Sequence, residues 1–309
     1  MTITVLDASP ALDGLDLSAL AALGTLQVHT ATSLSEVPAR LATAEIIVLN
    51  KVRLGPAELA GAPKLTLITV LATGYDVVDT IAAKAQGVTL CNIAGYSTAS
   101  TAQHAIALLL ELTNQVGTHA LGVASGEWVR RGIWSYAQTP LQELDGKTLV
   151  LVGYGAIGSR IGTIAKALGM RVLPVTRTRR AGSYSLTEAL PQADVVLLQC
   201  PLTPETRGLV NSAFLTQLRP GTLLVNCARG PVVEERAVAA ALESGHLAGF
   251  AADVLSTEPP APDNPLLSAP RCLLTPHLAW ATRASRERLL TETVDNIRAF
   301  QQGIPRNRV

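Results

Sequence analysis

The sequence has no excess of charge of either sign, because 25 lysines and arginines stand against 24 aspartates and glutamates. Proteins that bind nucleic acid through its phosphates have a basic patch, which this balance does not indicate. Apolar runs such as residues 105–110 fall far short of the ~20 residues that a membrane-spanning helix needs. Residues 1–13 contain no Lys or Arg, whereas a secretory signal peptide begins with a basic segment. We therefore expect a cytoplasmic protein without a nucleic-acid or membrane partner.

Cysteine is scarce, and its four residues lie far apart without forming a Cys-x-x-Cys pair. In a chain without an export signal, Cys91, Cys200, Cys227 and Cys272 are expected to be reduced and buried. His, Cys and Asp residues do not cluster at the spacing of metal ligands, so we expect no metal site.

The sequence does contain ample apolar surface, because 48% of its 309 residues are hydrophobic and only 16% are charged. This composition argues against disorder, and the length suggests two domains of roughly 100–200 residues each. Short β-branched runs alternate with Ala- and Leu-rich stretches, as is typical of parallel βαβ units in an α/β fold. A second series of such units begins at Lys147. Strands are predicted at residues 3–7, 26–29, 46–49, 65–70, 88–91, 148–152, 171–175, 194–199, 222–226, 249–253 and 271–274.

Two long helices are also predicted. The first covers residues 97–117, with Gly117 as its end, and is apolar on more than one face. We expect it to be buried between domains or between subunits, with His104 packed. The second covers residues 283–302 and is long enough to pack back on the first series of strands.

A glycine-rich turn follows the first strand of the second series. Gly153, Gly155 and Gly158 match G-x-G-x-x-G, and a helix and a second strand follow, as a dinucleotide-binding motif requires. These glycines would permit the tight turn, the approach of the pyrophosphate and the close packing of the helix, respectively. Ala156 and Ile157 would add backbone N–H groups at the helix N-terminus. A purely structural turn and a methyltransferase nucleotide site are the alternatives.

The strand after this helix ends without the acidic residue that holds the ribose 2′-OH of NAD. Thr176 stands at that position, followed by Arg177, Arg179 and Arg180. A hydroxyl with guanidinium groups can accept a 2′-phosphate that a carboxylate would repel. The sequence therefore favours NADP over NAD, and a solvated basic loop is the alternative.

Four polar residues lie at or just beyond the ends of later strands, namely Arg229, Asp253, Glu258 and His277. Ligands of open α/β sheets bind at the carboxyl ends of strands, so we expect these side chains to converge on the nicotinamide. Each residue alone has an ordinary structural interpretation, such as a packed histidine, a turn or a helix cap. The ordered set favours a catalytic site.

These residues stand in motifs that resemble a known family, the D-isomer-specific 2-hydroxyacid dehydrogenases. The motifs are Asn226-x-Ala228-Arg229-Gly230, Asp253-Val254-x-x-x-Glu258-Pro259 and Thr275-Pro276-His277-x-Ala279. Other segments are similar to the glycerate dehydrogenase and hydroxypyruvate reductase branch, and the resemblance covers nearly the whole chain. These segments are residues 50–51, 70–75, 95–98, 102–104 and 277–283.

The resemblance implies two doubly wound parallel-sheet domains with the active site in the cleft between them. A flavodoxin-like substrate-binding domain would comprise residues 1–95, completed by a C-terminal helix at 285–309. A Rossmann dinucleotide-binding domain would comprise residues 96–284. The resemblance also implies a homodimer built on the dinucleotide-binding domain.

The resemblance assigns a role to each polar residue in the reduction of a 2-oxo acid. His277 would protonate the developing alkoxide, because imidazole exchanges protons near neutral pH. Glu258 would bond the other ring nitrogen and favour the charged imidazole. Arg229 would bind the substrate carboxylate and polarise the carbonyl, and Asp253 would contact the nicotinamide carboxamide.

Further site residues follow from the resemblance and from their positions. Backbone N–H groups of Ala72, Thr73 and Gly74 would hold the substrate carboxylate. Lys51 would face the distal end of the substrate, and Trp134 would reach the active site of a partner subunit. The remaining positions that match cofactor-lining residues are Thr101, Cys200, Pro201 and Cys227.

Three candidate functions follow. The first is reduction of hydroxypyruvate and glyoxylate to D-glycerate and glycolate, with NADP as the preferred cofactor and NAD as a second one. The second is a broader D-2-hydroxyacid dehydrogenase for apolar 2-oxo acids, although Lys51 suits a hydroxymethyl group better. The third is a dinucleotide-sensing corepressor, since some relatives of this fold are binding modules that retain the catalytic residues.

Overall fold

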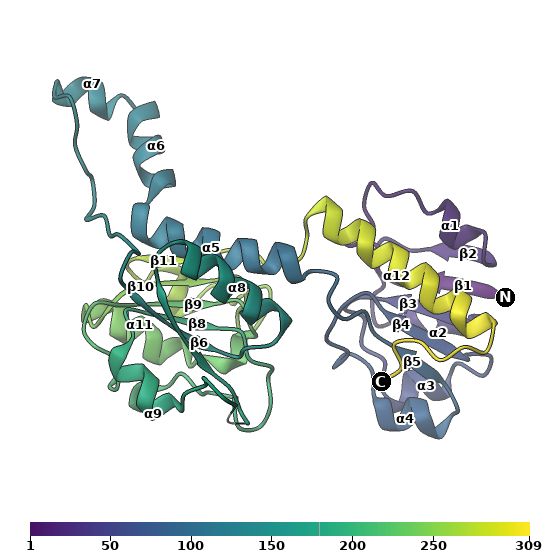
Figure 1. The fold of residues 1–309 in the computed structure, drawn as a ribbon. Helices are drawn as coiled ribbons and strands as arrows, with labels where there is room; N and C mark the ends of the chain where they lie inside the picture. The colour runs from purple at the N-terminus through teal and green to yellow at the C-terminus, as the bar shows by residue number, and fades with distance from the viewer. Residues whose placement is uncertain (179) are drawn as a thin grey trace. The chain divides into compact units, whose positions relative to one another are not determined.

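The chain forms two compact units in the computed structural model, which describes residues 1–178 and 180–309. The first unit comprises Met1–Ser97 and Trp280–Val309, and the second comprises Thr98–Ala279. Each unit is an α/β fold around one parallel sheet (Figure 1), which confirms the predicted fold class. The first unit thus ends at Ser97 and resumes at Trp280, which packs against a hydrophobic cluster of that unit; the domains predicted from the sequence were residues 1–95 with 285–309, and residues 96–284.

The sheet of the first unit has the strand order β2-β1-β3-β4-β5, and all neighbouring strands are parallel. This is the flavodoxin-like order, in which ligands bind where the order reverses, here at the carboxyl ends of β1 and β3. The strands are β1 (Thr2–Val5), β2 (Thr25–Val28), β3 (Ile46–Leu49), β4 (Leu67–Val70) and β5 (Thr89–Cys91).

Helices cover both faces of this sheet because its central strands are apolar on both faces. Along β3, Ile46 and Val48 belong to one hydrophobic cluster, and Ile47 and Leu49 belong to the other. The first cluster is closed by α1 (Ser18–Ala21) and α12 (Arg283–Gln301). The second is closed by α2 (Val37–Leu41), α3 (Pro56–Ala60) and α4 (Thr80–Ala85). The last helix of the chain therefore packs on the first series of strands.

The sheet of the second unit has the order β11-β10-β9-β8-β6-β7 and is parallel throughout. Its order reverses at β6, which lies between β7 and β8 and leads into the glycine-rich turn. The strands are β6 (Thr148–Val152), β7 (Arg171–Val175), β8 (Val195–Leu198), β9 (Thr222–Asn226), β10 (Leu247–Ala252) and β11 (Cys272–Leu274). All the strands predicted from the sequence are present in the two units, with small shifts at their ends.

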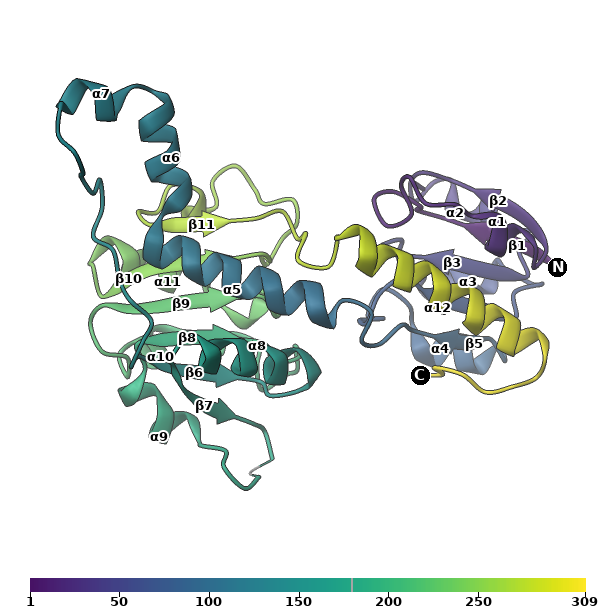
Figure 2. The ribbon, with the colours of Figure 1, turned by 45° about the horizontal axis from the view of Figure 1, so that its top comes forward.

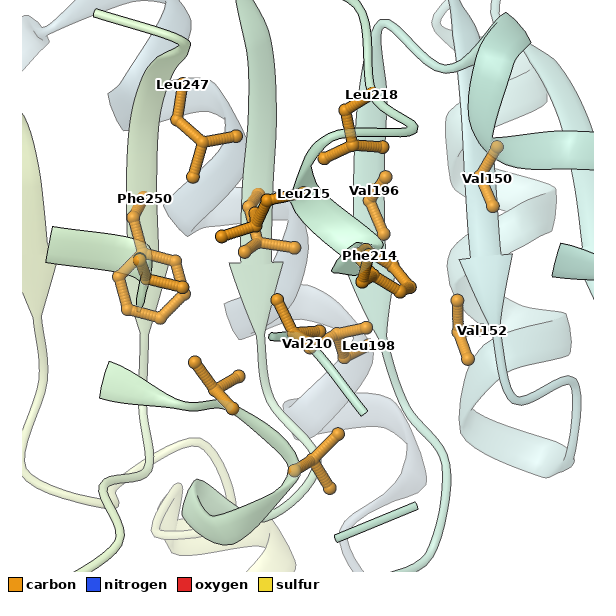
Figure 3. Close-up of a cluster of buried hydrophobic side chains, with 14 of the residues drawn as sticks. Val150, Val152, Val196, Leu198, Val210, Phe214, Leu215, Leu218, Leu247 and Phe250 are labelled. Atoms are coloured by element: carbon orange, nitrogen blue, oxygen red, sulfur yellow. The ribbon is translucent and has the colours of Figure 1, made fainter. Parts of the chain in front are cut away.

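Helices also cover both faces of the second sheet. On one face lie α5 (Thr98–Asn114) and α8 (Ala156–Ala167), and on the other lie α9 (Leu186–Ala189), α10 (Ser212–Leu215) and α11 (Glu235–Glu243). Figure 3 shows the core on the latter face, where Val196, Leu198 and Phe250 of the strands meet Phe214 of α10. Short 3-10 turns occupy Leu190–Gln192, Gly230–Val232 and Pro265–Leu267.

The helix predicted for residues 97–117 differs from the observed one. It ends at Asn114, Gln115 adopts a left-handed φ of +45°, and α6 (Val116–Ala124) and α7 (Glu127–Arg131) follow. Gly117 thus lies inside α6 and ends no helix. The apolar side chains of α5 pack against the sheet and α8 of its own unit, so burial between domains or subunits is not needed to explain them. Neither α5 nor another helix in the described part of the chain is long and apolar enough to cross a bilayer.

Candidate active site

The turn between β6 and α8 has room only for glycine at two positions. Gly153 has a φ of +99°, and a Cβ there would lie 2.5 Å from the backbone of Gln199. A Cβ on Gly158 would lie 2.2 Å from the carbonyl oxygen of Gly153, so α8 packs this close only without a side chain. At Gly155, by contrast, nothing lies within 4 Å of the Cβ position, which leaves open space at the N-cap of α8.

This open space fits the pyrophosphate of a dinucleotide. The first N–H groups of α8, which include those of Ala156 and Ile157, lack partners within the helix, and the helix dipole adds positive potential. Gln199 lies beside the turn, and its Oε1 is buried without a protein partner among the described residues. The N–H groups of α8, the open space at Gly155 and the buried Oε1 of Gln199 therefore lie together where the strand order of the second sheet reverses.

The loop after β7 carries the residues expected to distinguish NADP from NAD. Thr176 directly follows β7, and its hydroxyl donates to the carbonyl of Thr178 at 2.8 Å. Arg177 and Arg180 are exposed. Arg179 lies outside the described residues. The position at the end of β7 thus carries a hydroxyl with exposed guanidinium groups nearby.

His277 and Glu258 form a close pair beyond the strand ends of the second unit. His277 Nδ1 lies 2.6 Å from Glu258 Oε2, and the backbone N–H of Leu255 donates to Glu258 Oε1 at 3.0 Å. His277 has a φ of +51°, which is uncommon for a residue with a Cβ. Its own N–H donates to the carbonyl oxygens of Asp253 and Thr275, each at 2.9 Å. The Glu258 carboxylate therefore orients the imidazole ring of His277, and the backbone hydrogen bonds fix the conformation of the main chain at His277.

Asp253 directly follows β10 and is 2% exposed. Its Oδ1 accepts from the hydroxyl of Thr275 at 2.7 Å and from the N–H of Leu278 at 2.9 Å, and its Oδ2 accepts from the N–H of Ala279 at 2.8 Å. Burial by itself would raise the pKa of Asp253, but hydrogen bonds from His104, Thr275 and the two backbone groups lower it below its usual value. Asp253 therefore braces the segment that carries His277.

Arg229 lies just beyond β9, beside the loop that holds Glu258. Asn226 shapes this bend, because its Nδ2 donates to the carbonyl of Arg229 at 3.1 Å and its Oδ1 accepts from the N–H of Ala228 at 3.0 Å. A Cβ on Gly230 would lie 1.9 Å from the backbone carbon of Leu255. Only glycine permits this approach of the two loops.

The other predicted cofactor positions lie on α5 and at strand ends of the second unit. Thr101, Cys200 and Cys227 are buried, whereas Pro201 is exposed. Burial raises the pKa of the Cys227 thiol, the charge of Asp253 adds to that rise, and burial also raises the pKa of Cys200. Both thiols are therefore neutral and suit an apolar wall. Within residues 1–178 and 180–309, no group of three His, Cys, Asp or Glu residues could hold a metal ion.

The substrate-binding residues predicted in the first unit follow β3 and β4. Asp7, just beyond β1, accepts from the backbone N–H groups of Lys51 and of both its neighbours at 2.6–3.1 Å. Asn50 Nδ2 donates to the carbonyl of Leu71, immediately before Ala72, at 2.9 Å. Ala72, Thr73 and Gly74 form the loop that follows β4. The Lys51 loop and residues 72–74 are therefore linked at the switch point of the first sheet.

Trp134 lies on the segment after α7, and its side chain is 91% exposed. It is therefore not packed into the site that surrounds His277 in its own chain.

Comparison with known proteins decides the family. Residues 106–279, nearly all of the second unit, match the family model for the NAD-binding domain of the D-isomer specific 2-hydroxyacid dehydrogenases. The chain belongs to this family. The dehydrogenase is 42% identical to a hydroxypyruvate reductase from Blautia hydrogenotrophica, over 99% of both chains. It is 39% identical to a glycerate dehydrogenase from Methylorubrum extorquens, over 88% of this chain and 87% of the other.

A solved structure shows the same fold. The dehydrogenase is similar to an NADPH-dependent glyoxylate/hydroxypyruvate reductase from Sinorhizobium meliloti, solved in complex with NADP and malonate. The TM-score is 0.87, with 30% identity over 100% of this chain and 96% of the other. The predicted family and reaction class are confirmed: the dehydrogenase transfers hydride between NAD(P)H and a 2-oxo acid.

Two residues of the dehydrogenase escaped the sequence reasoning. Asp7 carried a signal, because it is the last residue of the strand predicted at residues 3–7 and lies just beyond β1, whose carboxyl end is at the switch point. His104 was expected only to be packed on its helix, but its Nε2 lies 3.0 Å from the hydroxyl of Thr275. His104 and Thr275 are 171 positions apart, so no local pattern indicates that they are in contact.

Proposed function

We propose that the dehydrogenase reduces hydroxypyruvate and glyoxylate to D-glycerate and glycolate. The observation that carries the chemistry is the 2.6 Å contact between His277 Nδ1 and Glu258 Oε2, which leaves Nε2 as the atom that delivers a proton. The hydroxypyruvate reductase that matches over 99% of both chains supports the substrate. When bound, the nicotinamide supplies the hydride.

The residues of the chain supply the proton and stabilise the charge. His277 donates from Nε2 to the developing alkoxide, while the Glu258 carboxylate stabilises the charged ring and keeps it oriented. Arg229 binds the substrate carboxylate and polarises the carbonyl, since its guanidinium offers a fork of donors. We assign the backbone N–H groups of residues 72–74 to the substrate carboxylate and Lys51 to its hydroxymethyl end.

An initial-rate panel tests the proposed substrate. It compares hydroxypyruvate, glyoxylate, pyruvate and longer 2-oxo acids, each with NADPH and with NADH. We expect the highest kcat/KM for hydroxypyruvate. A preference for pyruvate or longer acids would favour a broader D-2-hydroxyacid dehydrogenase. Cofactor binding without turnover of any acid would favour a dinucleotide-sensing binding protein.

We further propose that the dehydrogenase prefers NADPH. The support is the hydroxyl of Thr176 in place of a carboxylate, with exposed Arg177 and Arg180 beside it. The related reductase from S. meliloti is NADPH-dependent by its description. The panel above gives the ratio of kcat/KM for the two cofactors.

Glu258→Gln is expected to lower kcat for hydroxypyruvate. The amide can still hold His277 Nδ1, but it replaces a charge-assisted hydrogen bond by a weaker neutral one, so the ring is less well oriented for proton transfer. The measurement is kcat and KM of both enzymes with hydroxypyruvate. An unchanged kcat would contradict the role assigned to Glu258.

We also propose that the dehydrogenase is a homodimer assembled through α6, α7 and the segment that follows. These elements extend away from the sheet of the second unit (Figures 1 and 2). They expose a series of large apolar side chains, as expected of a protein interface. The exposed residues are Val116, Leu121, Val123, Trp128, Val129, Ile133 and Trp134.

Light scattering after gel filtration is expected to give twice the 32.3 kDa mass of one chain. Leu121→Glu combined with Val129→Glu should give a monomer, because the interface would have to bury two charges. Leu34→Glu is the matched control, since Leu34 is equally exposed but lies in the first unit. A wild-type monomer at micromolar concentration would contradict this assembly.

A further inference from the structure

We propose that His104 is a positioning residue that holds the proton donor His277 in place through Thr275 and Asp253. The inference rests on the proton-donor role of His277 proposed above. It connects a residue of α5 to Thr275, Asp253 and His277, which lie beyond strand ends of the second unit. His104, Thr275, Asp253 and His277 all lie within that unit.

The hydrogen positions in this network follow from the carboxylate. Thr275 Oγ1 lies 2.7 Å from Asp253 Oδ1, and an ionised carboxylate only accepts, so the hydroxyl hydrogen of Thr275 points to Asp253. The oxygen of Thr275 is then the acceptor for His104 Nε2, 3.0 Å away. His104 Nε2 also lies 3.4 Å from Asp253 Oδ1. Nε2 must therefore carry a hydrogen and donate it into the Thr275–Asp253 pair.

The network ends at the backbone of His277 and of the two residues that follow it. The Asp253 side chain accepts from the N–H groups of Leu278 and Ala279, which directly follow His277. The Asp253 carbonyl accepts from the N–H of His277 itself at 2.9 Å. A left-handed φ such as the +51° of His277 persists only where the surroundings hold it. The hydrogen bonds to Asp253 keep the backbone of His277 in this conformation, and His104 and Thr275 orient the Asp253 carboxylate.

Water is poorly placed to replace the imidazole of His104. The Asp253 side chain is 2% exposed and that of His104 is 18% exposed. Without the His104 donor, Thr275 and the carboxylate lose a partner in a site of low dielectric, where a missing hydrogen bond costs most. The segment 275–279 would then shift, and His277 would shift with it. Because a 1 Å misplacement can cost 10²-fold in rate, we expect kcat to fall about tenfold.

Hydrogen exchange tests the contact without relying on turnover. His104→Leu should speed the exchange of the Leu278 and Ala279 amides, which donate to Asp253. His104→Gln should restore slow exchange, because its side-chain amide can donate from nearly the same place as Nε2. His246→Leu is the matched control, since it also removes one imidazole hydrogen bond of the second unit, but to the carbonyl of Leu215. Unchanged exchange in His104→Leu would overturn the proposal.

Kinetics test the consequence for the reaction. In His104→Leu, kcat for hydroxypyruvate should fall about tenfold with KM nearly unchanged. The isotope effect with cofactor deuterated at the transferred position should rise, because the chemical step becomes slower. A loss of folded enzyme would lower kcat and leave this isotope effect unchanged, which would overturn the positioning role. His104→Gln should recover most of the rate.

A double-mutant cycle tests the route through Thr275. Thr275→Val removes the hydroxyl at nearly constant shape, and combining it with His104→Leu should lower kcat no further than the larger single loss. Additive losses would mean that His104 acts by another route and would overturn the proposal. If wild-type enzyme turned over no 2-oxo acid, the proposed function would fail, whereas the exchange experiment would still decide the His104 contact.

Discussion

Replacement of His277 by asparagine is expected to lower kcat for hydroxypyruvate by about 10²–10⁴-fold while NADPH still binds. Asparagine cannot deliver a proton, but it tolerates a left-handed backbone better than most residues do. It therefore suits the φ of +51° at this position. His277→Ala should lose as much activity and add backbone strain. The measurements are steady-state kinetics and a fluorescence titration with NADPH.

The matched control for this prediction is His246→Asn. His246 lies in the same unit, and its Nε2 contacts the carbonyl of Leu215 at 2.8 Å, so we assign it a structural role. Its replacement should leave kcat unchanged. Wild-type turnover by His277→Asn would show that another group supplies the proton, and it would remove His277 from the proposed mechanism.

Thr176→Asp is expected to change the cofactor preference from NADPH to NADH. The new carboxylate would accept a hydrogen bond from the ribose 2′-OH, and a hydrogen bond to a charged group contributes ~1.5–3 kcal/mol. It would also repel the 2′-phosphate of NADPH. Since 1.4 kcal/mol corresponds to a factor of ten, the two effects together should change the ratio of kcat/KM values by about 10²-fold.

The measurement is kcat/KM for NADPH and NADH with hydroxypyruvate, in wild type and variant. Thr163→Asp adds the same charge at an exposed position on α8 and should leave the ratio unchanged. Added salt should weaken NADPH binding more than NADH binding in the wild type, because the extra contacts involve exposed arginines. A wild-type enzyme that prefers NADH would mean that these arginines belong to a solvated loop.

The strands and the glycine turn could be predicted from the sequence, because both depend on short-range patterns. A short apolar and β-branched run such as Thr148–Val152, bounded by a glycine turn, is typical of a strand that is buried on both faces of a parallel sheet. Gly153 is favoured by its φ of +99° in the tight turn, and Gly158 is required by a contact with the carbonyl of Gly153 in the same turn, so a local motif already encodes both. The positions of Arg229, Glu258 and His277 near one edge also follow from the strand order, since parallel strands all end on the same side.

The residues that hold these side chains in place could be identified only from the folded chain. His104 contacts Thr275, which is 171 positions away in the sequence. Gly230 approaches the backbone of Leu255 closely, and no sequence motif indicates this approach. The turn at Gln115 was also missed, because Gly117 indicated the end of the helix, whereas α5 ends at Asn114 and Gly117 lies inside α6. Each of these features depends on contacts between segments that are brought together by the packing of helices on the sheet. The intrinsic propensity of a residue for helix or strand carries no information about such long-range contacts. It was enough to predict the strands themselves.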